Sequence, residues 1–295
     1  MKKIISIVSA LALSSLTYQA SASNELCLVS NNDCTFVLLS TKVSVKVSQI
    51  VSEQESDKVT QGASFIEESE KLLLVNKARA RQRFSPFSTF KVPNSLIGLD
   101  TQIIADAKQA LTFDKEKYPV QKWWPSVWKL AEYNLNSALK FSMVAIYRQL
   151  ATDIGQQKMQ SYVDNFAYGN QDISSGIDNF WLGGSMKISA IEQVQFLQRM
   201  HQHQLAVKPQ SIEILTEVML VDSTADYKLY AKTGAGKVTA TDKSSKAMLG
   251  WYIGFVENSA GVHYFAFNFT RASYAKMKAA RIKIAMNHLK KAGII

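Results

Sequence analysis

The sequence predicts a mixed α/β fold: one mainly antiparallel sheet flanked by helices and built from both chain ends, with an all-helical subdomain inserted between its halves. Three observations predict it. Residues 35–51 alternate and are rich in β-branched side chains, helical patterns dominate the middle of the chain, and three further strand patterns with a last helix follow Pro209. Strands at both ends require a shared core, so one sheet is the simplest architecture.

The first 22 residues predict a cleaved secretory signal peptide. Two lysines precede a largely apolar run over residues 4–16, and residues 20–22 read Ala-Ser-Ala, a small-x-small cleavage site. Polar residues at 14, 15, 17 and 19 break the run before it reaches the roughly 18 residues that a membrane span requires. We therefore expect a periplasmic or secreted protein, residues 23–295, that does not insert into a membrane after signal removal.

Residues 23–295 are expected to form one domain with an α/β part, about 23–98 and 206–295, and a helical part, about 99–205. Helical character is expected from Ser88 to Asp100 and over most of residues 101–205. Ser189 with Glu192 predicts a capping box at a helix start. The expected elements are one or two strands in 35–51, loop and edge strand in 52–84, a helix at 137–155 ending at Gly155, strands at 227–234, 247–257 and 262–269, and a helix at 273–291.

Composition and residue spacing exclude several classes of function. The formal charge is +10, but the lysines are scattered and no nucleic-acid-binding motif is present, so no nucleic-acid partner is expected. The four histidines show no metal-ligand spacing with the cysteines, and His201-x-His203 is expected at the solvated end of a helix, so no metal is expected. Export favours a disulfide between Cys27 and Cys34 over two free thiols. The protein is expected to be a monomer or a homodimer.

A possible serine nucleophile with a lysine three residues later occurs four times, at Ser88/Lys91, Ser126/Lys129, Ser137/Lys140 and Ser273/Lys276. At a helix start such a pair shares one face, and the helix dipole favours developing negative charge. Lysine can take the proton of serine only where its charged form is suppressed, as an apolar pocket would do. Most such pairs are ordinary surface neighbours, so the rest of the chain must distinguish them.

Two later stretches single out Ser88/Lys91. Ser142-Met143-Val144 is expected inside an apolar helix, and Lys232-Thr233-Gly234 follows a strand. A serine with lysine, a second serine and then Lys-Thr-Gly form the ordered signature of the penicillin-binding and serine β-lactamase superfamily. From about residue 83 onward the chain resembles the class D (oxacillinase-type) serine β-lactamases, through RFSPFSTFKVPNSLIGLD (83–100), KFSMVAIYRQLATDIG (140–155), FAYGNQDIS (166–174), FWLGGSMKISAIEQVQFL (180–197), YAKTGAGK (230–237) and GWYIGFVE (250–257).

The resemblance implies a role for each matching residue. Ser88 would be acylated, and Lys91, N-carboxylated by CO2, would be the general base for acylation and deacylation, with no other cofactor. Ser142 would relay a proton to the leaving nitrogen, and Lys232, a fourth catalytic residue, would tune Ser142 together with Thr233. The substrate carboxylate would be bound by Lys232, Thr233 and Arg281, and the oxyanion hole would be formed by the backbone N–H groups of Ser88 and Ala235. Val144 would keep the pocket dry, and Trp181 would donate a hydrogen bond to the carbamate. Gly234 completes the Lys-Thr-Gly motif, and Tyr168 and Asn170 belong to the family's Tyr-Gly-Asn triplet.

The function implied is hydrolysis of the β-lactam ring of penicillin-type antibiotics, which confers resistance. The first alternative is a β-lactam sensor that stays acylated, a type of protein normally attached to a membrane segment. The second is a D-Ala-D-Ala peptidase, which normally has asparagine where Val144 stands. One residue departs from the family pattern: bulky Phe87 precedes the nucleophile, where a small residue is usual.

Overall fold

The computed structural model describes residues 26–28, 33–50, 61–238 and 247–295. The predicted signal peptide, residues 1–22, lies outside the described residues. Within the described ranges no helix is long and apolar enough to cross a bilayer.

A six-stranded sheet is assembled from both chain ends, as predicted. Its strands are β1 (Cys34–Ile50), β2 (Gln61–Val75), β3 (Leu220–Ser223), β4 (Tyr227–Lys237), β5 (Met248–Asn258) and β6 (Gly261–Arg271), in the order β2-β1-β6-β5-β4-β3 with antiparallel pairing throughout. β1 pairs with β2 from Phe36↔Val75 to Ile50↔Gln61 and, on its other side, with β6 from Cys34↔Phe269 to Thr41↔Val262. The predicted edge strand in 52–84 is β2, whereas the short edge strand β3 was not predicted.

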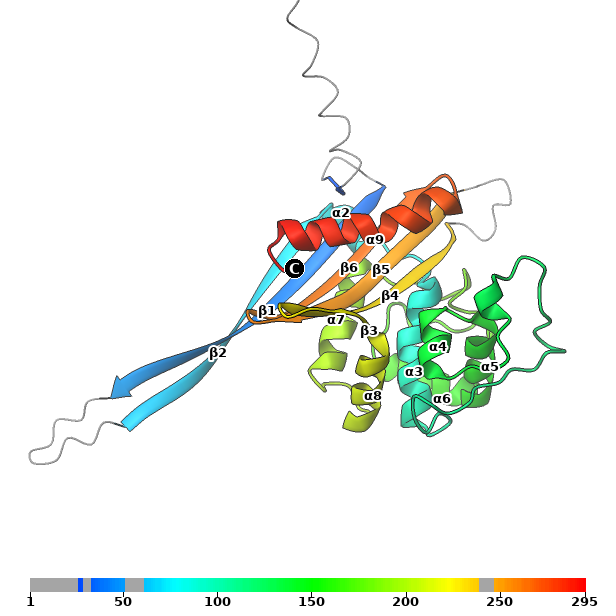
Figure 1. Ribbon diagram of the computed structural model, residues 1–295, viewed down its shortest axis with the longest axis horizontal. Helices are drawn as coiled ribbons and strands as arrows, with labels where there is room; N and C mark the ends of the chain where they lie inside the picture. Colours follow the sequence, from blue (N-terminus) through cyan, green and yellow to red (C-terminus); the bar gives the residue numbers. More distant parts are fainter. Residues whose placement is uncertain (1–25, 29–32, 51–60, 239–246) are drawn as a thin grey trace, which may run out of the picture.

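Helices cover both faces of the sheet (Figure 1). On β1, Phe36 and Leu38 face the core under α9 (Tyr274–Lys291), while Val37 and Leu39 face the core that includes α7 (Ala190–His201) and the helical part of the protein. This alternation is the period of two that a strand requires when both of its faces are buried. The sheet therefore separates two apolar cores.

The remaining helices form the part of the protein on the α7 side of the sheet (Figure 1). They are α2 (Lys77–Arg81), the 3₁₀ turn η1 (Phe87–Phe90), α3 (Lys91–Asp100), the 3₁₀ turn η2 (Ser126–Trp128), α4 (Leu135–Lys140), α5 (Val144–Ile154), α6 (Gln156–Asn165) and α8 (Pro209–Met219). α3 contacts α5 and α8 and is buried from Lys91 to Leu99, so it is the central helix of this part. The predicted capping box of Ser189 and Glu192 begins α7.

The prediction of one helix over residues 137–155 is wrong, because the chain turns at Ser142 between α4 and α5. Ser142 has a left-handed backbone (φ 55°). Its N–H donates to the carbonyl of Leu139, and that of Met143 donates to Ala138. These two bonds are those of a Schellman helix end, in which glycine is the usual left-handed residue. Because serine rarely marks a helix end of this kind, the sequence did not predict that the helix would end before Ser142.

Two other expectations are also corrected. Residues 101–134 contain turns and η2 rather than the predicted helices, in part because Asp106 and Asp114 accept hydrogen bonds from backbone N–H groups two and three residues ahead. His203 is exposed just beyond the end of α7, as predicted, but His201, the last residue of α7, is only partly exposed. Its ring nitrogens lie 3.0 Å from a Glu257 carboxylate oxygen and 3.0 Å from the Tyr264 hydroxyl, so it links α7 to β5 and β6.

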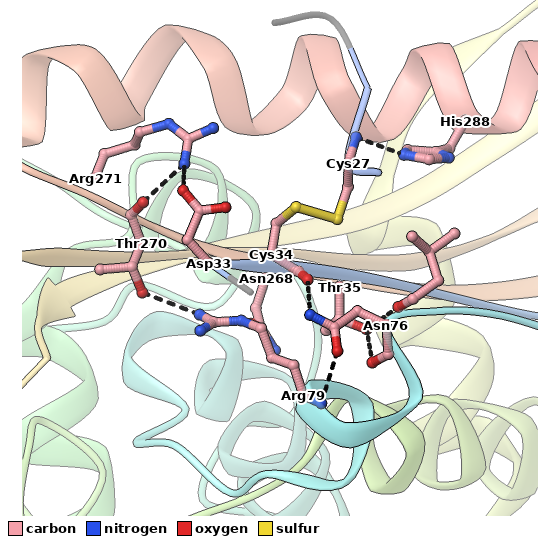
Figure 2. The surroundings of a disulfide bond; sticks show 11 residues. Cys27, Asp33, Cys34, Thr35, Asn76, Arg79, Asn268, Thr270, Arg271 and His288 are labelled. Atoms are coloured by element: carbon pink, nitrogen blue, oxygen red, sulfur yellow. Dashed lines mark hydrogen bonds and ion pairs between the residues drawn. A yellow bond between two sulfur atoms is a disulfide. The ribbon is translucent and has the colours of Figure 1, made fainter. Parts of the chain in front are cut away.

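A disulfide joins Cys27 to Cys34 and holds the first described residues against α9 (Figure 2). The Cys27 N–H donates to Nε2 of His288 at 3.0 Å, and the His288 ring stacks on Phe36 with 4.6 Å between centroids. Burial lowers the pKa of His288 to about 4. The imidazole is therefore neutral at neutral pH, as an acceptor for this bond must be.

We predict that Cys27→Ser with Cys34→Ser lowers the free energy of unfolding by about 2–3 kcal/mol, the loop-closure value for a short loop. Urea unfolding followed by circular dichroism measures it. The native protein under reducing conditions should show the same loss, because reduction opens the same loop. Identical midpoints for the oxidised protein and the variant would contradict this contribution.

Candidate active site

The turn that carries Ser88 packs directly against strand β4. A Cβ atom added to Gly234 would come within 2.8 Å of the Pro86 carbonyl oxygen, and one added to Gly236 would come within 2.0 Å of the Phe87 ring. Glycine at both positions therefore lets η1 approach the strand. Phe87, with a left-handed backbone (φ 49°) and a buried ring, occupies the space above Gly236. The bulky residue before the nucleophile is thus accommodated because Gly236 of β4 has no side chain.

Ser88 and Lys91 lie together at the start of α3. Nζ of Lys91 is 3.1 Å from Oγ of Ser88 and lies over the Tyr147 ring, 5.0 Å from its centroid. Lys91 is completely buried, and this desolvation lowers its pKa from the usual 10.5 to about 7. A large fraction of the amine is therefore neutral near neutral pH, and a neutral amine can act as a base or a nucleophile.

Ser142 and Lys232 form a second pair of serine and lysine. The turn at Ser142 between α4 and α5 places its Oγ where Nζ of Lys232, on β4, donates a hydrogen bond to it. Lys232 is buried, and its pKa lies well below the usual value because of burial first, and then the positive charges of Lys91 and Arg281. These charge effects on Lys232 indicate that the three basic groups converge on one site.

The predicted substrate-binding residues lie on β4 and α9. Thr233, Gly234 and Ala235 follow Lys232 on β4, and Nη1 of Arg281 donates to the Gly234 carbonyl at 3.1 Å. A cleft of about 540 Å³ is lined by several residues, among them Lys232, Thr233, Tyr252 and Arg281. Nε of Arg281 is buried and has no hydrogen-bond partner within the described ranges. The cleft has three basic side chains, Lys140, Lys232 and Arg281, against one carboxylate, Glu217, and this excess of basic groups with the Thr233 hydroxyl suits a carboxylate.

The predicted supporting residues surround the Ser88 turn. The carbonyl of Trp181 accepts hydrogen bonds from the N–H of Phe87 and the hydroxyl of Ser85. The Trp181 ring stacks on Phe90 with 5.4 Å between centroids, while its buried indole N–H has no partner among the residues that the structure describes. The Tyr168 hydroxyl donates to the side chain of Gln193, whose amide group donates to Thr89. These contacts hold η1 from the side opposite β4.

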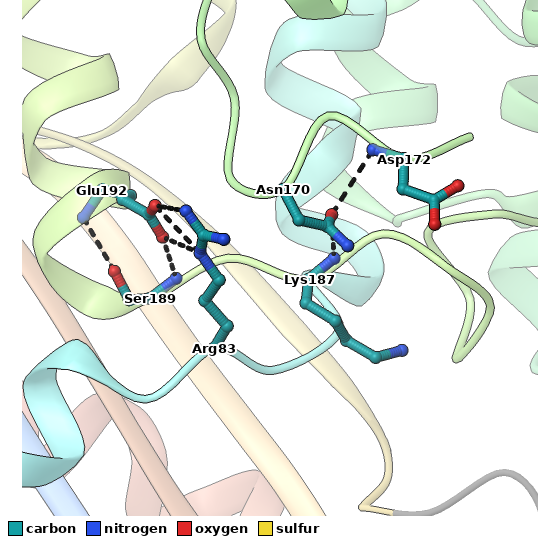
Figure 3. A network of polar contacts seen from close by, with 6 residues as sticks. All are labelled: Arg83, Asn170, Asp172, Lys187, Ser189 and Glu192. Carbon is teal, nitrogen blue, oxygen red and sulfur yellow. Dashed lines mark hydrogen bonds and ion pairs between the residues drawn. The ribbon is translucent and has the colours of Figure 1, made fainter. Parts of the chain in front are cut away.

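Asn170 and Val144 have different surroundings. The Asn170 side chain accepts from the Lys187 N–H and donates to the Ser185 carbonyl, so it ties the loop after Tyr168 to the segment before α7 (Figure 3). It stabilises this segment rather than contacting Ser88. Val144, the first residue of α5, is half-buried.

The other three Ser-x-x-Lys pairs have structural surroundings of another kind. Ser137 forms a capping box with Asn134 at the start of α4, and Ser273 caps α9 by accepting from the Lys276 N–H. Ser126 begins η2 at the protein surface. Their lysines (Lys129, Lys140 and Lys276) are exposed. Lys91 therefore differs from all three in being buried.

Sequence reasoning missed two residues that position the nucleophile's turn. The indole N–H of buried Trp251, on β5, donates to the Ser85 carbonyl at 3.0 Å. The hydroxyl of Ser95 donates to the Lys91 carbonyl at 2.7 Å and lies 2.8 Å from the Tyr147 hydroxyl. Trp251 belongs to an ordinary buried strand pattern, and Ser95 is one polar residue in an apolar helix. Neither pattern carries a signal of this role.

Two serine hydroxyls, each against a buried lysine, with a cleft that Lys232, Thr233 and Arg281 line, are the parts expected of a serine acyl-transfer site. The family described as the penicillin binding protein transpeptidase domain matches residues 35–290. β-Lactamase OXA-48 from Klebsiella pneumoniae is 37% identical over 193 residues, which are 65% of this chain and 68% of the relative. The mecR1 methicillin resistance protein of Staphylococcus aureus is 35% identical over 193 residues, which are 31% of its length.

A solved structure shows the same fold. The crystal structure of FUS-1 (OXA-85), a class D β-lactamase from Fusobacterium nucleatum subsp. polymorphum, superposes with a TM-score of 0.69 at 32% identity. The superposition covers 76% of this chain and 88% of that one. The chain therefore belongs to the penicillin-binding protein transpeptidase domain family and, within it, to the class D serine β-lactamases, which are β-lactam hydrolases.

We predict that Gly236→Ala lowers kcat/KM for a β-lactam by roughly 100-fold, because the new methyl group displaces Phe87 and with it the adjacent Ser88. The double variant Phe87→Ala with Gly236→Ala should recover most of the lost activity, since it removes the clash. Steady-state kinetics on the native protein, both single variants and the double variant measure this coupling. Equal activity of Gly236→Ala and the native protein would contradict it.

Proposed function

We propose that the protein hydrolyses penicillin-type β-lactams through a Ser88 acyl-enzyme, with an N-carboxylated Lys91 as general base for acylation and deacylation. The observation that carries the proposal is the environment of Lys91. Its amine is completely buried, lies 3.1 Å from the Ser88 hydroxyl, and has a pKa lowered to about 7 by burial alone. An amine in this state is reactive toward CO2 as well as basic.

Carboxylation explains two features that an unmodified lysine leaves unexplained. The neutral amine adds to CO2 and loses a proton, which gives a carbamate with one negative charge. This charge would offset the positive charges of Lys232 and Arg281, since Arg281 lies close enough to Lys232 to lower the pKa of that lysine. The buried Trp181 N–H, without a partner among the described residues, would donate a hydrogen bond to a carbamate oxygen. The half-buried Val144 would limit the access of water.

The remaining side chains support a complete acyl-transfer cycle. The carbamate accepts the proton of Ser88 as Oγ attacks the lactam carbonyl, and the backbone N–H groups of Ser88 and Ala235 stabilise the oxyanion. Ser142, hydrogen-bonded to Lys232, passes its proton to the lactam nitrogen as the C–N bond breaks and recovers one from the protonated carbamate, which becomes a base again. In the second half of the cycle the carbamate takes a proton from water, whose oxygen attacks the ester, and returns this proton to Oγ of Ser88 as the ester C–O bond breaks.

We propose that the substrate carboxylate is held by Lys232, Thr233 and Arg281. All three side chains line the cleft, and Lys232 also donates a hydrogen bond to Ser142. We also propose that the protein is exported by the signal in residues 1–22 and confers β-lactam resistance. The alternative function is a sensor that stays acylated. Its support is the 35% identity to part of the mecR1 protein.

We predict that hydrolysis of a chromogenic cephalosporin depends on CO2 and on pH. The pKa of Lys91 is lowered to about 7, so protonation below this pH leaves less neutral amine for CO2 to bind. Turnover should therefore fall as the pH falls through about 7, and added bicarbonate should restore it in part. Lys91→Ala should hydrolyse the substrate at least about 1,000-fold more slowly and should not respond to bicarbonate.

The outcomes separate the two functions. Mass spectrometry of the protein after mixing with substrate measures the acyl-enzyme on Ser88. A transient adduct with continuing turnover supports the hydrolase. A stable adduct at one per protein, with no turnover at saturating bicarbonate, would overturn the hydrolase in favour of the sensor.

We predict that Trp181→Phe raises the bicarbonate concentration needed for half-maximal activity by about tenfold. The change keeps an aromatic ring against Phe90 but removes the N–H proposed to bind the carbamate, a charge-assisted hydrogen bond. Trp251→Phe is the matched control, because its N–H binds the Ser85 carbonyl instead. The bicarbonate requirement of the control should stay near that of the native protein. An unchanged requirement in Trp181→Phe would remove Trp181 from this role.

A further inference from the structure

A loop at the outer edge of the helical part combines tryptophans with lysines. Residues 119–130, named here the tryptophan loop, belong to the connection between α3 and α4 (Figure 1). They include three of the chain's five tryptophans, Trp123, Trp124 and Trp128, and two lysines, Lys122 and Lys129, but no acidic residue. The loop is therefore both aromatic and positively charged.

Trp123 is presented to solvent by its neighbours rather than covered by them. Its ring contacts those of Trp124 and Trp128 edge to face, with centroids 6.4 and 5.7 Å apart. Trp124 is buried and packs on Phe113, and the indole N–H of Trp128 donates to the Phe141 carbonyl at 2.7 Å. Trp123 itself remains 69% exposed. Two anchored rings thus hold a large apolar side chain outward.

Two aliphatic side chains of the same loop are also exposed, Val120 at 54% and Leu130 at 44%. Lys122 directly precedes Trp123, and Lys129 directly precedes Leu130, and both lysines are exposed. Acidic residues occur on either side of the loop, at Glu116 and Glu132, outside the stretch that carries the tryptophans. Among the residues that the structure describes, Ser88, Lys91 and Lys232 form no hydrogen bond or ion pair with Trp123.

We propose that the tryptophan loop docks the protein on an anionic phospholipid surface. Trp123 enters the interfacial region together with Val120 and Leu130, while Lys122 and Lys129 bind lipid phosphates. An indole ring prefers the membrane interface because one end is apolar and the other is a hydrogen-bond donor. Basic residues add attraction to anionic headgroups. Exposed aliphatic side chains beside the indole favour a lipid surface over a sugar, which would stack on the ring alone.

Sedimentation with lipid vesicles tests the proposal on the full exported chain. The protein should bind vesicles that contain phosphatidylglycerol and should bind phosphatidylcholine vesicles much more weakly, with the difference lost at high salt. Trp123→Ala should lower the partition coefficient about tenfold, because the variant lacks the apolar indole surface that the native protein would transfer from water into the membrane interface. Lys122→Gln with Lys129→Gln should lower it by roughly fivefold per lysine.

The matched control is Lys71→Gln with Lys77→Gln, which removes the same charge at exposed positions on β2 and α2. It should bind vesicles like the native protein, and all variants should hydrolyse a chromogenic cephalosporin at the native rate, which shows that they fold. Equal loss of binding in the control and the loop variants would overturn the proposal in favour of net charge alone. Native protein that binds peptidoglycan or another protein, but no anionic vesicle, would also overturn it.

Discussion

The amine of Lys91 is completely buried at the start of α3, and the chemistry proposed for the site follows from this enclosure. An isolated ammonium ion in such a place would cost several kcal/mol, so the group is driven toward its neutral form. Lys232 and Arg281 converge on the same region, and no acidic residue is among the causes of the shifted pKa of Lys91 or Lys232 within the described part of the chain. Although the exposed Glu217 lines the adjoining cleft, the described residues give these two lysines no close negative charge. The carbamate, the oxyanion and the substrate carboxylate would each bring negative charge into the site.

The enclosure requires segments from distant parts of the chain. The nucleophile's turn is held by the glycines of β4, by Trp251 of the neighbouring strand β5 and by Trp181, so the sheet and the loop before α7 are both needed. A sheet built from the two chain ends brings β4 to this place only when the fold is complete. The close contact of Gly236 with Phe87 shows how tight the fit is. The contact that packs η1 against β4 is thus also the contact that positions Ser88.

The sequence was sufficient to predict the features that repeat regularly or carry a motif. Alternation predicted the long strands, and the order of Ser88, Ser142 and Lys232 predicted which side chains meet, although they are far apart in the chain. It was insufficient where a residue adopts an unusual backbone. Ser142 replaces the expected glycine at a helix end, so periodicity continued through the break. The pairing of Phe87 with Gly236 depends on contact between distant segments, which no local pattern records.

The central claim is that Lys91 carries a carbamate during turnover. Carbon-13 nuclear magnetic resonance of the protein equilibrated with labelled bicarbonate tests it most directly, with Lys91→Arg as control. The account predicts a carbamate resonance in the native protein that weakens as the pH falls through about 7 and is absent from the control. A fully active native protein without this resonance at saturating bicarbonate would contradict the account.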